Sequence, residues 1–518
     1  MGQSLRRVIV VGAGPGGLAS AMLCRNAGLD VTVVERMDRV GGRCATLDID
    51  GFKFDTGPTF FLHPQILDEI FASCGYDLWS ELQLTQLDPM YRIVFGGGGA
   101  LDCTANVEQM KQQIAALSPA DAEQFEPFIA YNKNKFEHLR PALERPWHGW
   151  ADLLKPSTLK LLPHLKPHQS VTADVGSFFN DPRVRLAFTF QSLYLGMSPY
   201  NCPSLFSILA FLEYESGVWH PKGGCGAVSE TMARIARQMG VDIRLNEPVE
   251  EILFDGRRAV GVRTKAETLP ADALVVNADF AQAMTQLVPN RLRRRWTDAK
   301  LARKKFSCST FMLYLGLNGV YEDLPHHSIY ISADYDRNIA DIVRRKVLSV
   351  DPSCYVQNAS VTDPTLAPPG KSTLYVLLPV PHQTENVDWS EAAPRYRQVA
   401  LDQLKRLGLH DIEDRIEVER VVTPDGWIRD FNIYKGATFN LSHGFGQLLH
   451  LRPQNRFEEL DGVYIAGGGT HPGSGLPVIY EGARISTRLM FQDFGLPHDW
   501  LMPGQASGPM SPMARVAE

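Results

Sequence analysis

The sequence predicts a chain of mixed α/β and α+β class, organised around a Rossmann-like nucleotide-binding domain that is discontinuous in sequence. Two observations predict it. A strand, a glycine turn, a helix and a second strand open the chain within residues 7–43, and a further strand that runs into glycines and a helix occupies residues 462–489. Between them lie a mainly helical stretch at about 105–215 and a mixed stretch at about 300–445. We therefore expect additional domains inserted into the nucleotide-binding one.

The opening strand and turn have the pattern of a dinucleotide site. Residues 8–12 are apolar or small, as a buried parallel strand requires, and Gly12, Gly14 and Gly17 follow as a G-x-G-x-x-G turn. Glycines let the backbone approach a pyrophosphate, and the N–H groups at the start of the next helix bind it. The alternative is a glycine turn in a parallel sheet that binds nothing.

The residues after the second strand indicate which nucleotide fits the turn. Residues 31–34 end at Glu35, where an acid binds a ribose hydroxyl and favours an unphosphorylated ribose. Gly41, Gly42 and Arg43 then form a second glycine pair with a cation. A nicotinamide cofactor has no evident use for this pair, whereas an extended FAD has more phosphate and ribityl to hold. The sequence therefore favours FAD.

The composition excludes several classes of protein. With 44% hydrophobic and 21% charged residues the chain can bury a sizeable core, and its net charge of -6 argues against nucleic acid as a partner. The eight cysteines contain no C-x-x-C pair and no metal-like cluster. We therefore expect buried thiols, a reducing cytoplasmic compartment and no metal site.

The apolar runs of the sequence are too short for a transmembrane helix, which needs about 18 residues. The longest runs, at 205–212 and 374–380, have the length of core segments. The nucleotide strand begins within a few residues of Met1, so we expect no cleavable signal peptide. If the protein handles lipid, it is expected to do so from the membrane surface.

The stretch at about 105–215 has helical periodicity, clearest at 107–117 and 120–136, and Ser118 begins a sequence typical of a helix start. Residues 133–166 are locally basic and interleaved with apolar residues, including Trp147 and Trp150. This pattern suits a surface that contacts anionic lipid. The alternative is a solvated helical face with two core tryptophans.

The nucleotide pattern resumes at Gly223 and Gly224, which open a predicted helix. Val249 is expected beside the adenine, with its backbone N–H and C=O reading the base edge. Further strands are predicted at 241–246, 249–252, 259–262 and 273–276, the last of which returns to the parallel sheet.

The other segments complete the expected organisation. Residues 51–58 alternate into an Asp-x-Gly turn, which fits a strand near the cofactor or a surface hairpin, and residues 96–99 predict a loose hairpin. Strands at 310–317, 374–380 and 416–422, with a helix at 394–407, predict a second sheet. The strand at 462–466 and the helix at 476–489 enclose a glycine loop, which places a helix N-terminus toward a ligand.

Motifs spread over nearly the whole chain resemble those of a known family. They read GAGPGGL, ERMDRVGGR, SLYLGMSP, SGVWHPKGG, LNEPVEEI, PHHSIYIS, VTDPTLAPPGKSTLYVLLPVPH, FNIYKGATFNLS and GGGTHPGSGLP. Together they are similar to the bacterial-type phytoene desaturase family, FAD-dependent carotenoid desaturases of the flavin amine oxidase and GDP-dissociation-inhibitor-like superfamily. Gly482 stands where the resemblance leads us to expect Ser, which leaves the exact polyene open.

The resemblance implies where the cofactor binds and how the chain divides. The adenosine and phosphates are expected at Gly12, Gly14, Gly17, Glu35, Arg36, Gly42, Arg43 and Val249, and the ribityl and isoalloxazine at Gly468, Gly469, Gly475, Leu476, Pro477 and Val478. The expected parts are an FAD-binding domain (1–95, 220–300 and 446–500), a sheet-based substrate domain (96–110 and 301–445), a helical membrane-facing cap (111–219) and a disordered tail (503–518).

The resemblance also implies the activity, which is the introduction of C=C bonds into phytoene or a related hydrophobic polyene by hydride transfer to the flavin. The partners it implies are a membrane surface, with the protein peripheral to it, and oxygen or a quinone as electron acceptor. We assign no catalytic residue, because a polyene itself stabilises positive charge; His471 is compatible with a base or with a structural role.

Several alternatives stay open at this point. Aromatic residues that suit a substrate tunnel suit a core equally well: Phe60, Phe61, Tyr194, Phe206, Phe211, Trp219, Phe311 and Tyr330. The alternative activities are a carotenoid oxygenase, ketolase or isomerase and, more remotely, an amine oxidase. A non-catalytic prenyl-lipid-binding protein of the same fold is the alternative from another class.

Overall fold

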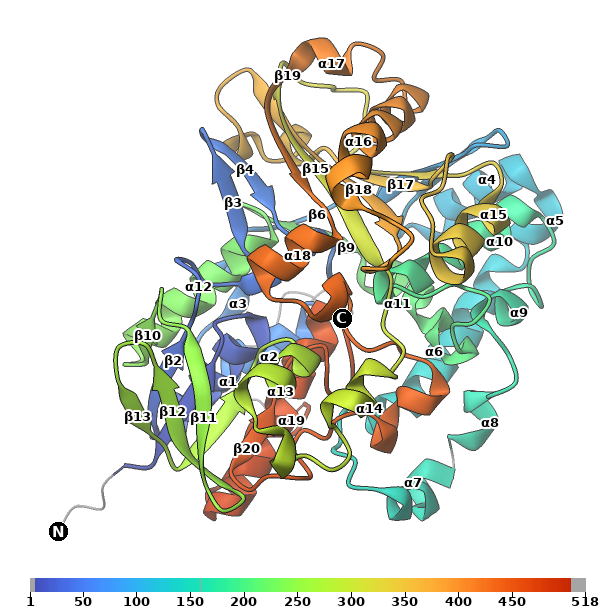
Figure 1. The fold of residues 1–518 in the computed structure, drawn as a ribbon. Helices are drawn as coiled ribbons and strands as arrows, with labels where there is room; N and C mark the ends of the chain where they lie inside the picture. Colours follow the sequence, from blue (N-terminus) through green and yellow to red (C-terminus); the bar gives the residue numbers. More distant parts are fainter. Residues whose placement is uncertain (1–4, 160, 505–518) are drawn as a thin grey trace.

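A five-stranded sheet forms the centre of the nucleotide-binding half of the molecule (Figure 1). The computed structural model describes residues 5–159 and 161–504. Three separate segments of the chain contribute strands to this sheet, and all neighbouring pairs are parallel. The strand order is β10 (Asp242–Arg244), β2 (Asp30–Val34), β1 (Arg7–Val11), β14 (Ala273–Val276) and β20 (Val463–Ile465). The discontinuous parallel sheet predicted from the sequence is confirmed.

Side-chain alternation along β1 explains how both faces of this sheet are covered. Val8 and Val10 pack into one core, and Ile9 and Val11 into another on the opposite face. The first core is completed by α1 (Pro15–Asn26), α2 (Gln65–Ser73), α3 (Leu78–Glu81), α12 (Cys225–Gln238) and α19 (Leu476–Phe494). The second is completed by α13 (Phe280–Leu287) and the antiparallel sheet β11 (Val249–Asp255), β12 (Arg258–Thr264) and β13 (Thr268–Pro270).

A seven-stranded sheet forms the second half, at the top of Figure 1. Neighbouring strands in this sheet are antiparallel, except for the parallel pair β16 and β7. The order is β19 (Ile416–Val422), β15 (Ser309–Asn318), β18 (Lys371–Val380), β17 (Cys354–Gln357), β16 (His327–Ile331), β7 (Tyr91–Phe95) and β8 (Ala100–Cys103).

The central strand β15 joins the two halves because it is buried on both faces. Phe311 and Leu313 pack against α16 (Trp389–Arg406), whereas Met312 and Tyr314 contact the hairpin formed by β3 (Thr46–Ile49) and β4 (Phe52–Asp55). That hairpin follows directly from the nucleotide-binding segment. It therefore fixes the cofactor half against the sheet-based half, and its predicted strand is confirmed.

One boundary of the expected domain division needs correction. The division assigns residues 1–95 to the nucleotide-binding domain, but β7 pairs with β16 and so belongs to the seven-stranded sheet. The turn at 96–99 does join β7 to β8, as predicted. Strand pairing with a segment more than two hundred residues away decides the place of β7, and local sequence carries no signal for it. The rest of the division stays a prediction.

The helical region packs over β7 and β8. Its helices are α4 (Val107–Leu117), α5 (Pro119–Ala122), α6 (Phe125–Leu143), α7 (Pro156–Leu159), α8 (Leu162–Leu165), α9 (Val171–Val175), α10 (Pro182–Ala187) and α11 (Ile208–Ser216). Ser118 caps α5, as predicted. The predicted single helix at 120–136 is broken, because the buried Asp121 turns inward to accept from the backbone N–H groups of Asn180 and Asp181.

Shorter elements connect these layers. They are the small sheet of β5 (Phe61–Leu62), β9 (Val218–Pro221) and β6 (Leu84–Gln86), and the helices α14 (Asp298–Ala302), α15 (Tyr335–Ala340), α17 (Ile412–Arg415) and α18 (Pro424–Phe431). The predicted disordered tail falls mainly on residues 505–518, which lie outside the described residues.

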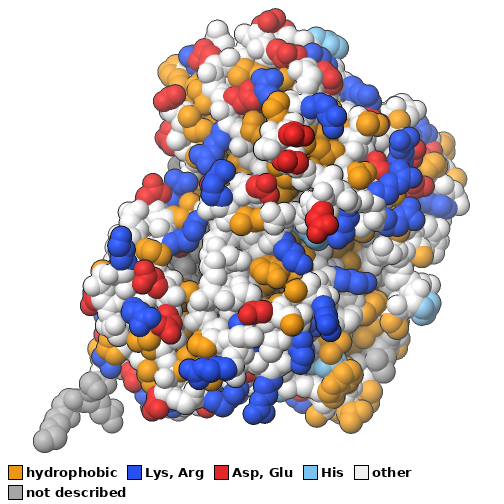
Figure 2. All heavy atoms as spheres, viewed as in Figure 1, with side chains coloured by type: hydrophobic (Ala, Val, Ile, Leu, Met, Phe, Trp, Pro, Cys, Tyr) orange, Lys and Arg blue, Asp and Glu red, His pale blue; other side chains and the backbone are white. Residues whose placement is uncertain are grey.

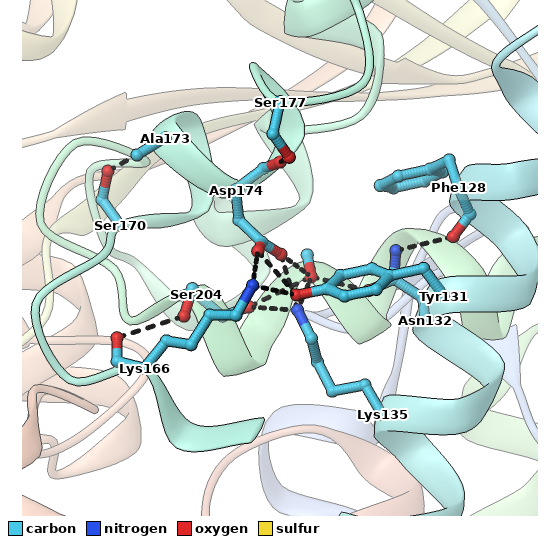
Figure 3. A network of polar contacts seen from close by, with 11 residues as sticks. Phe128, Tyr131, Asn132, Lys135, Lys166, Ser170, Ala173, Asp174, Ser177 and Ser204 are labelled. Carbon is cyan, nitrogen blue, oxygen red and sulfur yellow. Dashed lines mark hydrogen bonds and ion pairs between the residues drawn. The ribbon is translucent and has the colours of Figure 1, made fainter. Parts of the chain in front are cut away.

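A buried ion pair ties α6 to the rest of the helical region (Figure 3). Lys135 Nζ lies 2.6 Å from Asp174 Oδ2 and also donates to the carbonyl of Ser204 and the hydroxyl of Ser207. Tyr131 OH donates to the other carboxylate oxygen of Asp174. The side chains come from α6, from α9 and from the segment before α11, so the network holds three elements together.

The cysteines and the helices agree with two further expectations. All eight cysteines are buried and free of disulfides, and burial raises the pKa of thiols such as that of Cys24 to about 12. Among the helices at residues 5–159 and 161–504, none combines the length and apolar character needed to cross a membrane.

Candidate functional site

The first glycine turn is closed so tightly that its glycines cannot carry a side chain. A Cβ on Gly12, whose φ is +98°, would lie 2.5 Å from the carbonyl oxygen of Asn277. A Cβ on Gly17 would lie 2.2 Å from the carbonyl oxygen of Gly12. Both distances are far below van der Waals contact. The turn therefore depends on glycine at these two positions.

The same turn presents unused hydrogen-bond donors. Within the described residues, the backbone N–H groups of Gly14, Gly16 and Gly17 at the N-terminus of α1 have no acceptor. The first N–H groups of a helix have no partner inside it and carry the positive end of its dipole. This end of α1 is therefore suited to an anionic group such as a pyrophosphate.

Glu35 lies at the end of β2, beside the turn. Its carboxylate accepts from the backbone N–H of Ala13 over 2.7 Å and of Met37 over 2.9 Å. Burial raises the pKa of Glu35, and these two hydrogen bonds offset part of that shift. The carbonyl of Glu35 accepts from Glu247, so the segment that leads to Val249 runs alongside this strand end.

The second glycine pair rests on the first turn, since Gly41 N–H donates to the carbonyl of Ala13. Arg43 is half-buried, and its guanidinium donates to the carbonyl of Thr438 over 2.5 Å. In the amide orientation that satisfies both of its neighbours, Asn440 accepts from Arg43 and donates to Asp279 over 2.7 Å. Burial lowers the pKa of Arg43 and the charge of Asp279 opposes that shift, so the two groups form a compensated pair.

The third glycine loop closes over the start of α1. A Cβ on Gly16 would lie 3.4 Å from the backbone nitrogen of Gly467. The loop ends at Gly475, the residue that precedes α19, and α19 begins with Leu476, Pro477 and Val478. Among the described residues, the N–H groups of Leu476 and Val478 have no acceptor. The structure thus sets a second helix N-terminus next to the first.

These three segments form one continuous cradle that fits an extended dinucleotide. The first two bring Gly12, Gly14, Gly17, Glu35, Gly42 and Arg43 together, and the third adds Gly468, Gly469, Gly475, Leu476, Pro477 and Val478. Arg36 has a different contact, because its guanidinium donates to the carbonyl of Asp430. The fit rests on open N–H groups, on glycines that a Cβ would block and on an acid at the strand end.

Comparison with known proteins identifies the family to which the chain belongs. Residues 15–488 match the family model described as flavin containing amine oxidoreductase. The chain belongs to the flavin-containing amine oxidoreductase family. The match begins at the start of α1 and contains the second and third segments of the cradle, and the cofactor of this family is FAD.

Proteins with similar sequences or structures cover nearly the whole chain. A 4,4'-diapophytoene desaturase (4,4'-diapolycopene-forming) of Methylomonas sp is 43% identical over 489 residues, which are 94% of this chain and 95% of the relative. An all-trans-zeta-carotene desaturase of Myxococcus xanthus is 41% identical, with 95% of each chain covered. The solved structure of a putrescine oxidase bound to putrescine aligns with a TM-score of 0.63 at 18% identity, covering 95% of this chain and 99% of that one. The last likeness concerns the fold alone.

His471 lies in the third loop, beside the end of α6. Its ring is 2% exposed and packs against Trp147, and the carbonyls of Ala142 and Leu143 at the end of α6 lie beside it. Its pKa is lowered to about 3 because of burial and of the nearby Arg452. A neutral imidazole wedged against α6 fits a structural role.

An aromatic cluster begins beside the cradle. Gly57 abuts Arg43, since a Cβ on Gly57 would lie 2.5 Å from the Arg43 carbonyl oxygen, and Phe60 follows three residues later. Phe60 stacks on His327 with ring centroids 4.2 Å apart and contacts Tyr355 and Tyr194 at 5.5 Å. Burial lowers the pKa of His327 well below its usual value, so this wall is uncharged.

The structure separates the aromatic residues that the sequence left undecided. Phe60 and Tyr194 lie in this cluster, whereas Phe311 and Tyr330 pack into the core beneath α16 and Phe61 into the core of the parallel sheet. A cavity of about 730 Å³ elsewhere in the molecule is lined by residues such as Arg92, Asp102 and Arg406 and contains none of the cradle residues.

Glu213 lies fully buried next to the aromatic cluster and makes the stability depend on pH. Tyr91 OH and Gln191 Nε2 donate to it over 2.7 and 3.1 Å. Burial raises the pKa of Glu213 from 4.5 to about 7, and the folded state therefore binds this proton more tightly than the unfolded chain. The stability that Glu213 contributes is complete below about pH 4.5 and is lost as the pH rises to about 7.

Replacing Glu213 with glutamine is expected to remove this dependence. Between pH 4.5 and 8 the free energy of unfolding of E213Q should fall by about 3 kcal/mol less than that of the wild type. Urea denaturation at several pH values measures it. Parallel pH profiles for the two proteins would contradict the assignment.

Sequence reasoning missed three polar residues that organise the cradle. Asn277 contacts the first turn, Asn440 bridges Arg43 to Asp279, and Arg452 donates to carbonyls of the third loop. Asn277 had a usable signal, because it follows a parallel strand at the edge of the sheet where ligands bind. Asn440 and Arg452 belong to loops and match no spacing rule.

Proposed function

We propose that this protein is an FAD-dependent carotenoid desaturase, which introduces C=C bonds into phytoene or a related polyene. The observation that carries the proposal is the 43% identity to a diapophytoene desaturase over 94% of the chain. A zeta-carotene desaturase at 41% and a neurosporene-forming phytoene desaturase at 35% support the same substrate class. The exact polyene and the number of steps are left open by these differences among relatives.

The residues of the chain suit this chemistry. When bound, FAD supplies a hydride acceptor. The aromatic wall of Phe60, Tyr194, Tyr355 and neutral His327 is uncharged; His327 is buried and the other three are half-buried, so the wall can position an apolar chain. No side chain is assigned as a base. Oxygen or a membrane quinone is the proposed electron acceptor.

We also propose that the helical region docks on a membrane surface. Trp150 and Leu154 are 69% and 76% exposed, and Leu159 is exposed nearby. Figure 2 shows hydrophobic side chains gathered at the lower right, where Figure 1 has α7. Lys155 lies in the same segment and pairs with Asp152, and Arg140 lies on the adjoining helix and pairs with Glu144; both are about half exposed, and cations beside apolar residues suit anionic lipid. Trp147 is buried, so only one of the two tryptophans takes part.

Replacing Trp150 and Leu154 together with alanine is expected to weaken vesicle binding at least about tenfold, because each buried side chain contributes about 1.5–3 kcal/mol. Co-sedimentation with vesicles of phosphatidylglycerol and phosphatidylcholine measures it. Val350→Ala is the matched control, since Val350 is also 76% exposed but lies outside this segment. Equal binding by both variants would refute the docking surface.

The desaturase proposal is tested by expression in a bacterial host that makes only phytoene. Extracts should contain polyenes with longer conjugated systems and no added oxygen. An oxygenated or isomerised product would point to an oxygenase, ketolase or isomerase, and unchanged phytoene alongside purified flavoprotein would favour a binding protein.

A further inference from the structure

Arg452 is completely buried directly beneath the third glycine loop. Its guanidinium donates to the carbonyls of Gly468 over 2.7 Å and Thr470 over 2.9 Å, both within that loop. It also donates to the carbonyls of Leu441, Ser442 and Gln447 over 3.2 to 3.4 Å. All five acceptors are neutral backbone groups.

No carboxylate balances this charge among the residues that the structure describes. The ion pairs found there do not include Arg452, and burial lowers its pKa to about 9, which leaves it protonated at neutral pH. Its titratable neighbours, His443 and His471, are neutral because burial and Arg452 itself lower their pKa. Arg43, on the other side of the loop, is compensated by Asp279.

The need to bind the carbonyls of the third loop does not by itself explain why the residue at position 452 is charged. Asn455 is buried beside it and donates to the carbonyls of His471 and Gly482 without a charge. A buried charge without a counterion is costly, so a neutral residue would be the less expensive way to bind carbonyls. The charge lies at the loop that leads into the N-terminus of α19. This location indicates that the charge acts on a group bound at that helix end.

We propose that Arg452 is an electrostatic positioning residue that stabilises the reduced flavin. A hydride brings two electrons and one proton, so the flavin ring system gains one negative charge on reduction. Arg452 and the N-terminus of α19, into which its loop leads, would both stabilise that charge. Opposite charges about 10 Å apart at an effective dielectric constant of about 20 change an equilibrium constant by roughly tenfold. The proposal rests on the flavin family and is independent of the substrate.

The midpoint potential of the bound flavin tests the proposal. Reduction with xanthine and xanthine oxidase against a reference dye is expected to show about tenfold weaker two-electron reduction in R452Q, which is about 30 mV more negative. R452K keeps the charge but not the planar fork, and is expected to stay close to the wild type. If R452K shifts as far as R452Q, the effect is one of loop geometry and the proposal is wrong.

A second pair of variants leaves Arg452 in place. Ser442 is half-buried and its carbonyl already accepts from Arg452, so Ser442→Asp places a carboxylate next to the guanidinium, and Ser442→Asn is its uncharged control. S442D should lower the potential in the same direction as R452Q, and S442N should not. If R452Q retains no flavin, S442D and S442N still test whether the charge of Arg452 raises the flavin potential. A potential in S442D equal to that of S442N overturns the proposal.

Discussion

Replacing Gly17 with alanine is expected to weaken FAD binding at least about a hundredfold. The new Cβ would lie 2.2 Å from the carbonyl oxygen of Gly12 and 3.0 Å from the side-chain oxygen of Asn277. The turn must open to relieve these contacts, at a cost of about 1–3 kcal/mol or more, and opening it misaligns the N–H groups at the start of α1. The ratio of flavin to protein after purification, followed by titration of the apoprotein with FAD, measures the loss.

Gly97→Ala is the matched control for G17A. Gly97 lies in the turn between β7 and β8, and a Cβ there would meet no atom within 4 Å. G97A should bind FAD as the wild type does. If G17A keeps its full complement of FAD, the cradle described here does not hold the pyrophosphate.

Replacing Asp174 with asparagine is expected to lower the free energy of unfolding by about 3–5 kcal/mol. The change leaves the ammonium of Lys135 buried without a counterion, and only neutral acceptors remain: the Ser204 carbonyl, the Ser207 hydroxyl and the new amide oxygen (Figure 3). Burial already lowers the pKa of Lys135, and Asp174 is what opposes that shift. Urea denaturation of the flavoprotein measures the change.

Two further variants make this prediction specific. Lys133 lies on α6, as Lys135 does, and forms an ion pair with Glu215. Because both partners are about half exposed, Lys133→Met should lower the free energy of unfolding by less than about 1 kcal/mol. The double variant K135M/D174L removes both buried charges and should recover most of the stability lost in D174N. A loss in D174N no larger than in K133M would show that the buried network is not a main contributor to stability.

The sequence predicted those parts of the fold that depend on local pattern. Gly12, Gly17 and Glu35 lie where the spacing places them, because a tight turn and a strand end need these residue types within a short segment. The strands of the parallel sheet, and β15, β18 and β19 of the seven-stranded sheet, were predicted for the same reason, whereas β16 and β17 were not. The helix break after Ala122 and the place of β7 in the second sheet were not predicted, because partners far along the chain position Asp121 and β7.

The candidate site could be predicted only in part. Asn440 links Arg43 to Asp279 and Arg452 supports the third loop, yet neither residue carries a local signal because their roles arise from loops that meet in space. The substrate was inferred from resemblance alone, because the sequence does not distinguish aromatic residues that line a substrate tunnel from those of a core. The structure distinguishes Phe60 from Phe311, and that distinction depends on packing.

The central claim is that the protein is a flavin-dependent desaturase, and one assay tests it most directly. The purified FAD-loaded protein is incubated with phytoene in liposomes under ¹⁸O-labelled oxygen, and the products are analysed by absorption spectrum and mass. The account predicts a longer conjugated chromophore and the loss of two hydrogen atoms for each new double bond, with no labelled oxygen in the product. Labelled oxygen in the polyene, or unchanged phytoene with a fully FAD-loaded protein together with unchanged diapophytoene in a parallel incubation, would contradict it.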